Sequence, residues 1–251
     1  MIETKETIKK SQNTASVNTE HLWNKYYIVI MVINFVANVS FYLISSTLST
    51  YSIGLGATQT LAGIIVGFFS IVSLVARPFS GIIANRIRSS ILLVTSFLLM
   101  AVSAFGYGFI QIPSLFIPIR IVHGIGFSIN GVVTMVLISK IIPKSHLTKG
   151  MAYFGISQVF ASAVGPTAGS TLGQLFGYRY SFLAAAVTLV LAAIIVFVFP
   201  LPESRPASSQ KDNAQKKHPL FSWNELLDVH LIRLVIFSAF FSAFNGLCSS
   251  Y

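Results

Sequence analysis

Charge is scarce in this chain, and acidic residues are absent from its middle. Only 10% of the 251 residues are charged and 54% are hydrophobic, whereas soluble domains carry about a quarter charged residues. The acidic residues all lie toward the two ends of the sequence, at Glu3, Glu6, Glu20, Glu203, Asp212, Glu225 and Asp228. The long apolar stretches between them therefore hold no carboxylate, and the composition excludes a soluble globular protein.

Other absences exclude other kinds of site. Cys248 is the only cysteine, which excludes an intrachain disulfide and a cysteine-based metal site. The sequence contains no H-E-x-x-H zinc motif, no G-x-S-x-G nucleophile motif and no aspartate pair within an apolar run. We therefore expect no enzymatic activity, no metal and no cofactor. The polar N-terminal stretch is also too long for a signal peptide, because the first apolar run begins only at Tyr26.

Long apolar runs are the main feature that is present. A membrane-spanning helix needs about 20 mostly apolar residues. Six such runs and the start of a seventh occur at 26–49, 58–84, 91–110, 114–138, 151–172, 180–199 and 231–251. The predicted fold is therefore an all-α, polytopic membrane protein.

The runs divide the chain into four parts. We predict a cytoplasmic N-terminal tail over 1–25, a six-helix lobe over 26–200, a cytoplasmic linker with an amphipathic segment over 201–230, and a seventh transmembrane helix over 231–251. A seventh helix behind a long polar linker is an unusual end for a helical bundle. We therefore expect a two-lobed protein that is truncated early in its second lobe.

Basic residues are distributed unevenly among the predicted loops. The N-terminal tail and the loops after the second, fourth and sixth runs carry Lys and Arg, whereas the loops after the first and third carry no charge and the loop after the fifth has only Arg179. The positive-inside rule then places the N-terminus in the cytoplasm. The net charge of +10 points to an anionic lipid surface rather than to nucleic acid, and we expect a plasma-membrane location.

Polar side chains recur on one face of the first predicted span. Asn34, Asn38 and Tyr42 are spaced by four residues and share that face. Amides that face lipid are costly, so the face either lines a wet cavity or forms hydrogen bonds between packed helices. Because the polar row is longer than one packing contact needs, we favour a cavity that these residues line, together with Gln158 of the fifth span.

The fourth predicted span has a second polar face, which contains Arg120, His123 and Asn130. An arginine inside the membrane is expensive to bury. It must border water, a carboxylate or an anionic ligand, or else extend to the outer interface, about 10 Å away at 1.5 Å per residue. We favour the first alternative, in which the charge of Arg120 has a functional role. For His123, a proton-carrying role and a structural role stay equally open.

The stretch after the second span, "GIIANRIRSS", resembles a signature of the major facilitator superfamily, G-x-x-x-D-R/K-x-G-R/K-R/K. It matches at Gly81 and Arg86, has Asn85 in place of the Asp, and lacks the later Gly and the basic pair. In that family the signature forms a charged latch with the second lobe. The resemblance therefore implies a gating role for these three residues, while Arg77, close to the same end, would extend to the interface or join the latch.

Two further motifs resemble those of the drug:proton antiporter branch of this superfamily. In the fourth span, "RIVHGIG" is similar to R-x-x-Q-G-x-G, with Arg120, Gly124 and Gly126 matched and His123 in the Gln position. The resemblance implies that Arg120 takes part in proton or substrate coupling.

The fifth span contains "GPTAGS", which resembles the antiporter signature G-P-x-x-G-G at Gly165, Pro166 and Gly169. Glycines at this spacing let a neighbouring helix approach closely, and the proline bends its own helix. A helix that rocks against its neighbour and a helix that is statically packed are equally compatible with the spacing.

The resemblance implies the six-helix N-terminal lobe of a twelve-helix transporter, whose substrate binds between two lobes and gains access to each side in turn. We expect proton-coupled export of small organic molecules, with the lipid bilayer, protons and a small-molecule substrate as partners. Two alternatives stay open. One is an importer of a sugar or an organic anion in the same superfamily, and the other is a membrane protein that does not transport.

Overall fold

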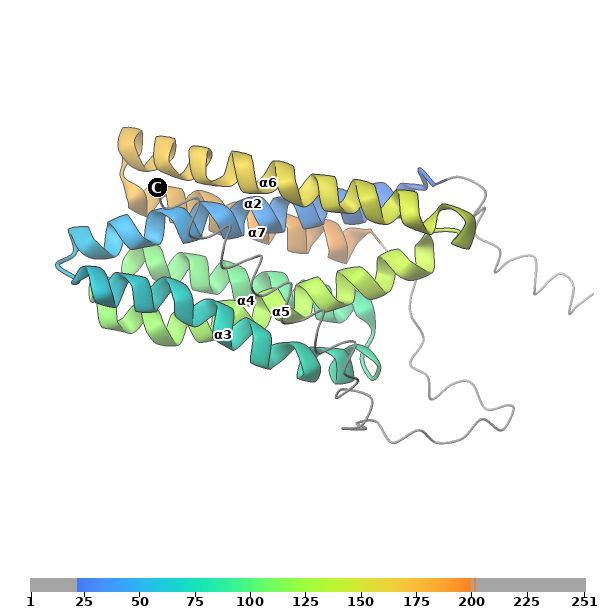
Figure 1. The fold of residues 1–251 in the computed structure, drawn as a ribbon, viewed down its shortest axis with the longest axis horizontal. Coiled ribbons are helices and arrows are strands. Elements are labelled where there is room, and N and C mark those ends of the chain that lie inside the picture. The colour runs from blue at the N-terminus through green and yellow to red at the C-terminus, as the bar shows by residue number, and fades with distance from the viewer. Residues whose placement is uncertain (1–21, 200, 202–251) are drawn as a thin grey trace, which may run out of the picture. The chain divides into compact units, whose positions relative to one another are not determined.

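The structure is a computed structural model that describes residues 22–199 and 201. The described residues form six long helices, which Figure 1 shows side by side: α2 (Lys25–Gly54), α3 (Gln59–Ala84), α4 (Ser89–Phe109), α5 (Phe116–Ile141), α6 (Leu147–Phe176) and α7 (Tyr178–Val198). Two short 3-10 helices, η1 (Pro113–Leu115) and η2 (Lys144–His146), precede α5 and α6. The helices predicted in the six-helix lobe are confirmed. The predicted linker beyond residue 201 and the predicted seventh helix lie outside the described residues.

Local side chains set several of the helix ends. The Asn24 side chain accepts a hydrogen bond of 3.3 Å from the backbone N–H of Tyr26 at the start of α2, and the Thr58 hydroxyl accepts one of 3.2 Å from Leu61 at the start of α3. Both contacts satisfy backbone donors that the first turn of a helix leaves unpaired. Gly177 connects α6 to α7 with a φ of +96°, a conformation that favours glycine.

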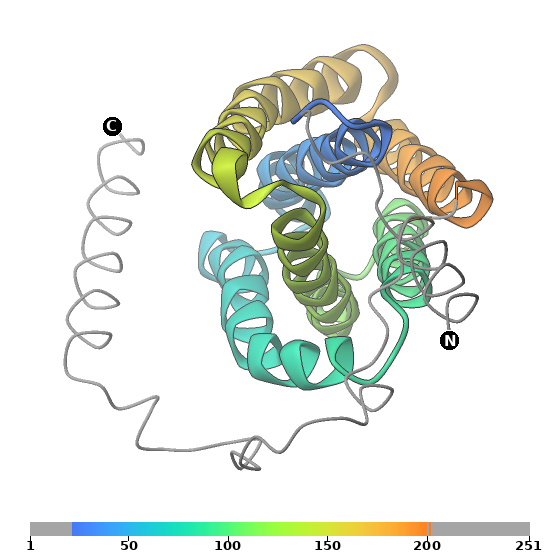
Figure 2. The ribbon, with the colours of Figure 1, turned by 90° about the vertical axis from the view of Figure 1, so that its right-hand side faces the viewer.

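The helices pack in a pattern that relates the first three to the last three. α2 lies along α6, α3 lies along α5, and α4 lies along both α5 and α7, as Figure 2 shows from one end of the bundle. If α2, α3 and α4 are exchanged with α5, α6 and α7, the α2–α6 pair becomes the α5–α3 pair and the α4–α7 pair is unchanged. This is the packing expected of two three-helix repeats.

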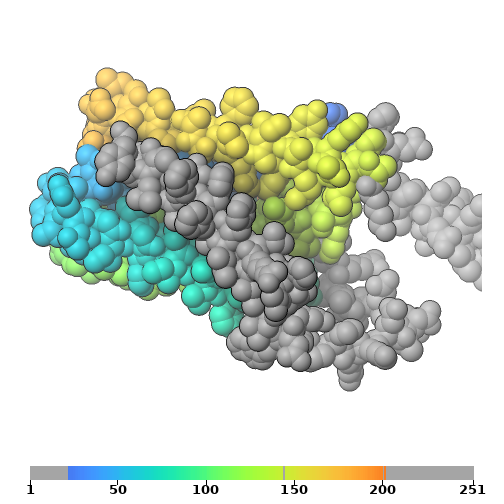
Figure 3. Space-filling model, viewed as in Figure 1, coloured from blue at the N-terminus to red at the C-terminus, as the bar shows by residue number. Residues whose placement is uncertain are grey.

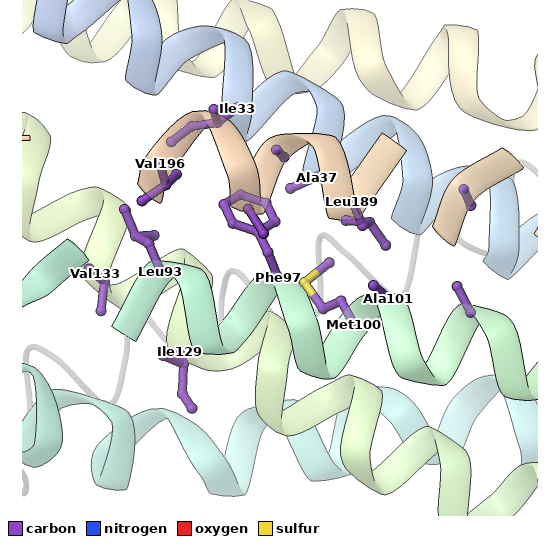
Figure 4. Packing of buried hydrophobic residues seen from close by; sticks show 14 of the residues in the cluster. Ile33, Ala37, Leu93, Phe97, Met100, Ala101, Ile129, Val133, Leu189 and Val196 are labelled. Carbon is purple, nitrogen blue, oxygen red and sulfur yellow. The ribbon is translucent and has the colours of Figure 1, made fainter. Parts of the chain in front are cut away.

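An apolar cluster in the interior of the bundle joins α4 to its neighbours. Phe97 and Met100 of α4 are fully buried and belong to one cluster with Ile33 of α2 and Leu189 of α7 (Figure 4). Close packing of such side chains is the main source of cohesion inside a helical bundle.

The outer surface of the bundle is apolar as well. Leu74 of α3, Phe160 of α6 and Phe197 of α7 are all exposed, and Figure 3 shows α6 and α3 along opposite edges of one face. Five segments are long and apolar enough to cross a membrane: α2, α3, α4, α7 and Pro113–Ile141, which joins η1 to α5. Helices that are apolar on every side are typical of a membrane bundle, so this is a multi-pass membrane protein.

The remaining long helix, α6, was predicted as a span and differs from the other five in composition. It has 30 residues, which is enough to cross a membrane. Glycine, serine and threonine recur along it, however, and lower its hydropathy. The glycines among these residues have a packing role that explains their presence.

Gly165 and Gly169 bring α6 against the backbone of α2. A Cβ atom at Gly165 would lie 2.6 Å from the Cβ of Tyr42 and 2.9 Å from the carbonyl oxygen of Val39, and one at Gly169 would lie 2.9 Å from the carbonyl oxygen of Leu43. These separations are too short for carbon, so only glycine fits. The contact lies inside the six-helix bundle, which favours static packing over rocking for this pair of helices.

Replacing Gly165 by alanine is expected to destabilise the bundle. The new methyl group overpacks the α2–α6 contact, at a cost of about 1–3 kcal/mol. The measurement is thermal unfolding of the complete protein in detergent, and the expected result is a lower midpoint for Gly165→Ala. Gly155→Ala on the same helix is the matched control, because no atom lies within 4 Å of its added Cβ. Equal midpoints for the two variants would contradict the packing role.

Candidate functional site

A polar cavity of about 560 Å³ lies among α2, α3, α5 and α6. It brings together six of the predicted site residues, all of them polar: Asn34, Asn38, Tyr42, Arg77, Asn130 and Gln158. Arg77 is seven residues from the end of α3, and Phe154, which also lines the cavity, is seven residues from the start of α6. At 1.5 Å per residue these positions are about 10 Å from the helix ends that adjoin the basic loops. The cavity therefore occupies the half of the bundle nearer those loops.

Amide groups in the cavity lack hydrogen-bond partners. The side chain N–H of Asn38 donates to the backbone oxygen of Asn34 at 2.8 Å and to its side chain oxygen at 3.2 Å. The Nδ2 atoms of Asn34 and Asn130, two residues of the cavity lining, are buried without any partner in the described part of the chain. A buried polar group without a partner is costly. These two donors are consequently suited to bind water or a polar solute that reaches them from the cavity.

Arg120 and His123 form a second polar cluster, separate from the cavity. Both side chains are 0% exposed, and none of their nitrogens has a hydrogen-bond partner among the described residues. The Arg120 guanidinium carbon lies 5.3 Å from the centre of the Phe69 ring and 5.6 Å from that of Tyr107. Both distances are within the range of cation–π attraction. Arg120 therefore points into the bundle and does not extend to the outer interface.

Three phenylalanine rings separate the cavity from the Arg120 cluster. Phe41 of α2 lies 4.7 Å from Phe69 of α3 and 4.6 Å from Phe127 of α5, and Phe69 lies 5.4 Å from Phe127, between ring centres. Phe41 and Phe127 line the cavity, while Phe69 lies 5.3 Å from the His123 ring. We call these three residues the aromatic partition. It divides the polar face of α5, which the sequence predicts as one continuous surface.

The motif residues at the end of α3 and the glycines of the α5 motif lie outside the cavity lining. Gly81 and Arg86 lie at the end of α3 and in the turn behind it, where Asn85 is the C-terminal cap. Gly124 and Gly126 are packing positions: an added Cβ would lie 3.0 Å from a Val72 side chain atom of α3 in the first case, and 3.0 Å from the Ser96 carbonyl oxygen of α4 in the second.

Two other predicted gating residues, Pro166 and Arg77, lie within helices α6 and α3. Pro166 is inside α6, next to the glycine that contacts α2. Arg77, expected at a latch or at the membrane interface, lines the cavity. Its position along α3 was visible in the sequence, but the direction of its side chain was not.

Several residues that build this region were missed. Phe41 and Phe69 of the aromatic partition, Tyr107 beside Arg120, and Ser73 of the cavity carry no motif. An aromatic residue in an apolar span has no distinguishing neighbourhood in the sequence. The only available signal was Tyr107, whose hydroxyl near the end of an apolar run needs a polar environment.

The sequence profile of the Major Facilitator Superfamily matches residues 30–251. The chain belongs to this superfamily. The superfamily assignment accounts for the two three-helix repeats, since nested repeats of three helices build each six-helix half of such proteins.

Several characterised and uncharacterised relatives share about a quarter of their residues with this chain. An uncharacterized MFS-type transporter of Methanocaldococcus jannaschii is 26% identical over 80% of this chain and 52% of its own length. The multi-drug resistance efflux pump PmrA of Streptococcus pneumoniae is 25% identical over 77% and 49%, and the quinolone resistance protein NorA of Staphylococcus aureus is 25% identical over 91% and 58%. The chain thus spans about half the length of the curated relatives that it matches.

Solved structures show the same fold. A peptide transporter POT variant in complex with alafosfalin superposes with a TM-score of 0.68 at 15% identity, covering 93% of this chain and 50% of the other. At this identity the likeness concerns the fold alone.

The aromatic partition is expected to block water and small reagents that enter from the cavity. In a Cys248→Ser background, a His123→Cys variant should react slowly with a membrane-impermeant thiol reagent added from the side of the basic loops. Adding Phe127→Ala should raise the labelling rate severalfold, because a half-buried ring of the partition is replaced by a methyl group. Gln158→Cys, in the cavity, is the control and should label readily with or without Phe127. Fast labelling of His123→Cys with Phe127 intact would contradict the partition.

Proposed function

We propose that the protein is a secondary transporter that exports small organic molecules in exchange for protons. The observation that carries this proposal is the cavity inside a membrane bundle, where buried amide donors without partners can bind a polar solute. Membership of the superfamily supports a transport role, and several relatives carry names of efflux proteins. Access would alternate between the two sides as the described bundle moves against a second one.

In this proposal the cavity residues bind substrate. Asn34 and Asn38 of α2, Asn130 of α5 and Gln158 of α6 present amides from three helices to one space of about 560 Å³. That size suits a small organic molecule. Tyr42 adds a hydroxyl and an aromatic face. The named residues thus supply both hydrogen bonding and apolar contact, as a carrier of amphipathic molecules requires.

Proton coupling is assigned to the Arg120 cluster. Residues 22–201 contain no Asp or Glu, so the carboxylate that usually carries the proton at membrane depth is not supplied by this bundle. His123 is buried next to Arg120 and can exchange a proton when water reaches it. Arg120 would act by holding the charge of this cluster, and its contact with Phe69 of the aromatic partition would link that charge to the cavity.

The proposal also includes an orientation and a location. The loops rich in Lys and Arg, and with them the N-terminus, would face the cytoplasm of a cell whose plasma membrane holds the protein. The cavity would then open toward the cytoplasm in the described conformation, which is the side from which an exporter loads. No enzymatic step is part of the proposal.

A second candidate is a carrier of sugars or organic anions that works as an importer. The amide-rich cavity favours it, because several side chain amides around one space suit hydroxyl or carboxylate groups. A probable sugar efflux transporter of Pasteurella multocida is 25% identical over 84% of this chain. Uptake measured in both right-side-out and everted vesicles distinguishes the two directions. A protein that does not transport, the third alternative, would move no substrate in either preparation.

Substitutions of Arg120 are expected to impair proton coupling without preventing insertion of the protein into the membrane. Arg120→Ala should abolish proton-driven export while the protein still reaches the membrane, and Arg120→Lys should keep part of the activity because it keeps the charge but not the planar guanidinium. The measurement is substrate accumulation in everted vesicles under an imposed pH gradient, with membrane content checked by immunoblot.

Arg179→Ala is the matched control for this test. Arg179 also lies over an aromatic ring, 4.6 Å from the centre of Phe109. It is exposed, however, and lies at the start of α7, at the end of the bundle away from the basic loops. Its replacement should leave export unchanged. Full proton-dependent export by Arg120→Ala would remove Arg120 from the mechanism.

A further inference from the structure

We infer that the cavity selects amphipathic organic anions over organic cations. The inference rests on the proposed function, in that it takes the cavity to be the substrate site, and it names the class of substrate. Its basis is the sign of the charge and the direction of the hydrogen bonds that the cavity offers.

Among the described residues that line the cavity, Arg77 is the only one with a charged side chain. Residues 22–201 contain Lys and Arg but no Asp or Glu, so nothing within the described bundle neutralises this guanidinium. Arg77 is exposed on α3 and is therefore available to a solute in the cavity. In a region of reduced dielectric constant, an uncompensated cation attracts an anion and repels a cation more strongly than it would in water.

The unpartnered amides of the cavity add to this preference. Because the Asn34 side chain oxygen already accepts from Asn38 at 3.2 Å, the atom that remains without a partner is its Nδ2 donor. The Nδ2 of Asn130 is also buried without a partner among the described residues. A carboxylate or a phosphonate accepts hydrogen bonds only, whereas an ammonium group only donates them. A solute group that reaches the Nδ2 of Asn34 must therefore accept a hydrogen bond, as an anion does.

The rest of the lining determines what the anionic group is attached to. Phe41, Phe127, Phe154 and Met135 line the same cavity as Arg77. These side chains favour an apolar, preferably aromatic, body. The chemistry that fits the cavity is consequently an aromatic or aliphatic body with one carboxylate or phosphonate, and a purely polar anion would leave the aromatic side chains uncovered.

The test uses three probes that share an aromatic body and differ in charge: naphthylacetate, naphthylethanol and naphthylethylammonium. Binding to the purified complete protein is measured by calorimetry. Naphthylacetate is expected to bind most tightly, and Arg77→Gln should weaken it by roughly tenfold to a hundredfold, the value of one charge-assisted hydrogen-bonded contact. Arg77→Gln should leave naphthylethanol unchanged. Lys140→Gln is the matched control, since it removes one positive charge from the same end of the bundle outside the cavity lining.

Three outcomes would overturn the inference: preferential binding of naphthylethylammonium, equal binding of all three probes, and no binding of naphthylacetate. An Arg77→Gln variant that keeps the full preference for naphthylacetate would also overturn it, even if the wild-type order of affinities is as expected.

Transport of the same probes in everted vesicles separates this inference from the proposed function. Proton-driven export of naphthylethylammonium but not of naphthylacetate would retain the transporter and reject anion selectivity. Binding of naphthylacetate that depends on Arg77, without any transport of it, would retain the anion site and count against proton-coupled export.

Discussion

The polar groups inside this bundle have to be stabilised without a carboxylate. Residues 22–201 contain no Asp or Glu, so within this part of the chain a buried arginine has no carboxylate for the ion pair that ordinarily offsets its desolvation. Arg120 has instead the faces of two aromatic rings, Phe69 and Tyr107, at 5.3 and 5.6 Å. Cation–π attraction recovers part of the lost hydration energy, but the guanidinium N–H groups have no hydrogen-bond partner among the described residues. Because these N–H groups lack partners, the cluster is expected to bind water or another charged group that reaches it.

The same constraint shapes the packing around the two polar regions. The Gly165–Gly169 contact holds α6 against the backbone of α2, and hydrogen bonds between neutral side chains, such as Ser80 with Ser128 at 3.1 Å and Ser40 with Thr188 at 3.1 Å, hold other pairs of helices. Neutral contacts of this kind do not compete for a cation. The rigid part of the bundle therefore leaves the charges of Arg77 and Arg120 available.

Sequence reasoning predicted the helices well, because their signal is length and composition. The predicted ends differ from the observed ones by a few residues, as at α2, which continues to Gly54, and at α6, which begins at Leu147, because polar residues beyond an apolar run can still be helical. Sequence reasoning also predicted which residues share a helical face, since that depends only on the period of the helix. The division of the α5 face between Arg120 and Asn130 was not predictable, because the aromatic partition comes from three helices whose packing has no local signature.

The position of Arg77 shows the same limit of prediction from the sequence. Its depth along α3 was evident from its distance to the helix end, and depth alone is compatible with an interfacial anchor. Whether a side chain at that depth points to lipid, to headgroups or to a cavity depends on the neighbours of the helix. Here α2, α5 and α6 enclose the space beside it, and this enclosure is a property of the tertiary structure.

An anionic substrate would change the energetics of the proposed exchange. Export of a monovalent cation for one proton moves no net charge across the membrane. Export of a monovalent anion for one proton moves two positive charge equivalents inward, and a negative interior potential favours each of them by about 2.3 kcal/mol per 100 mV. A bundle with cations and no carboxylate would thus be suited to an export that the membrane potential drives as well as the pH gradient. The requirement on the protein is that the anion and the proton do not occupy it together, because bound together they would leave as a neutral pair. Occupancy of one site must therefore oppose occupancy of the other, and the contact of Arg120 with Phe69 of the aromatic partition offers a route for such coupling.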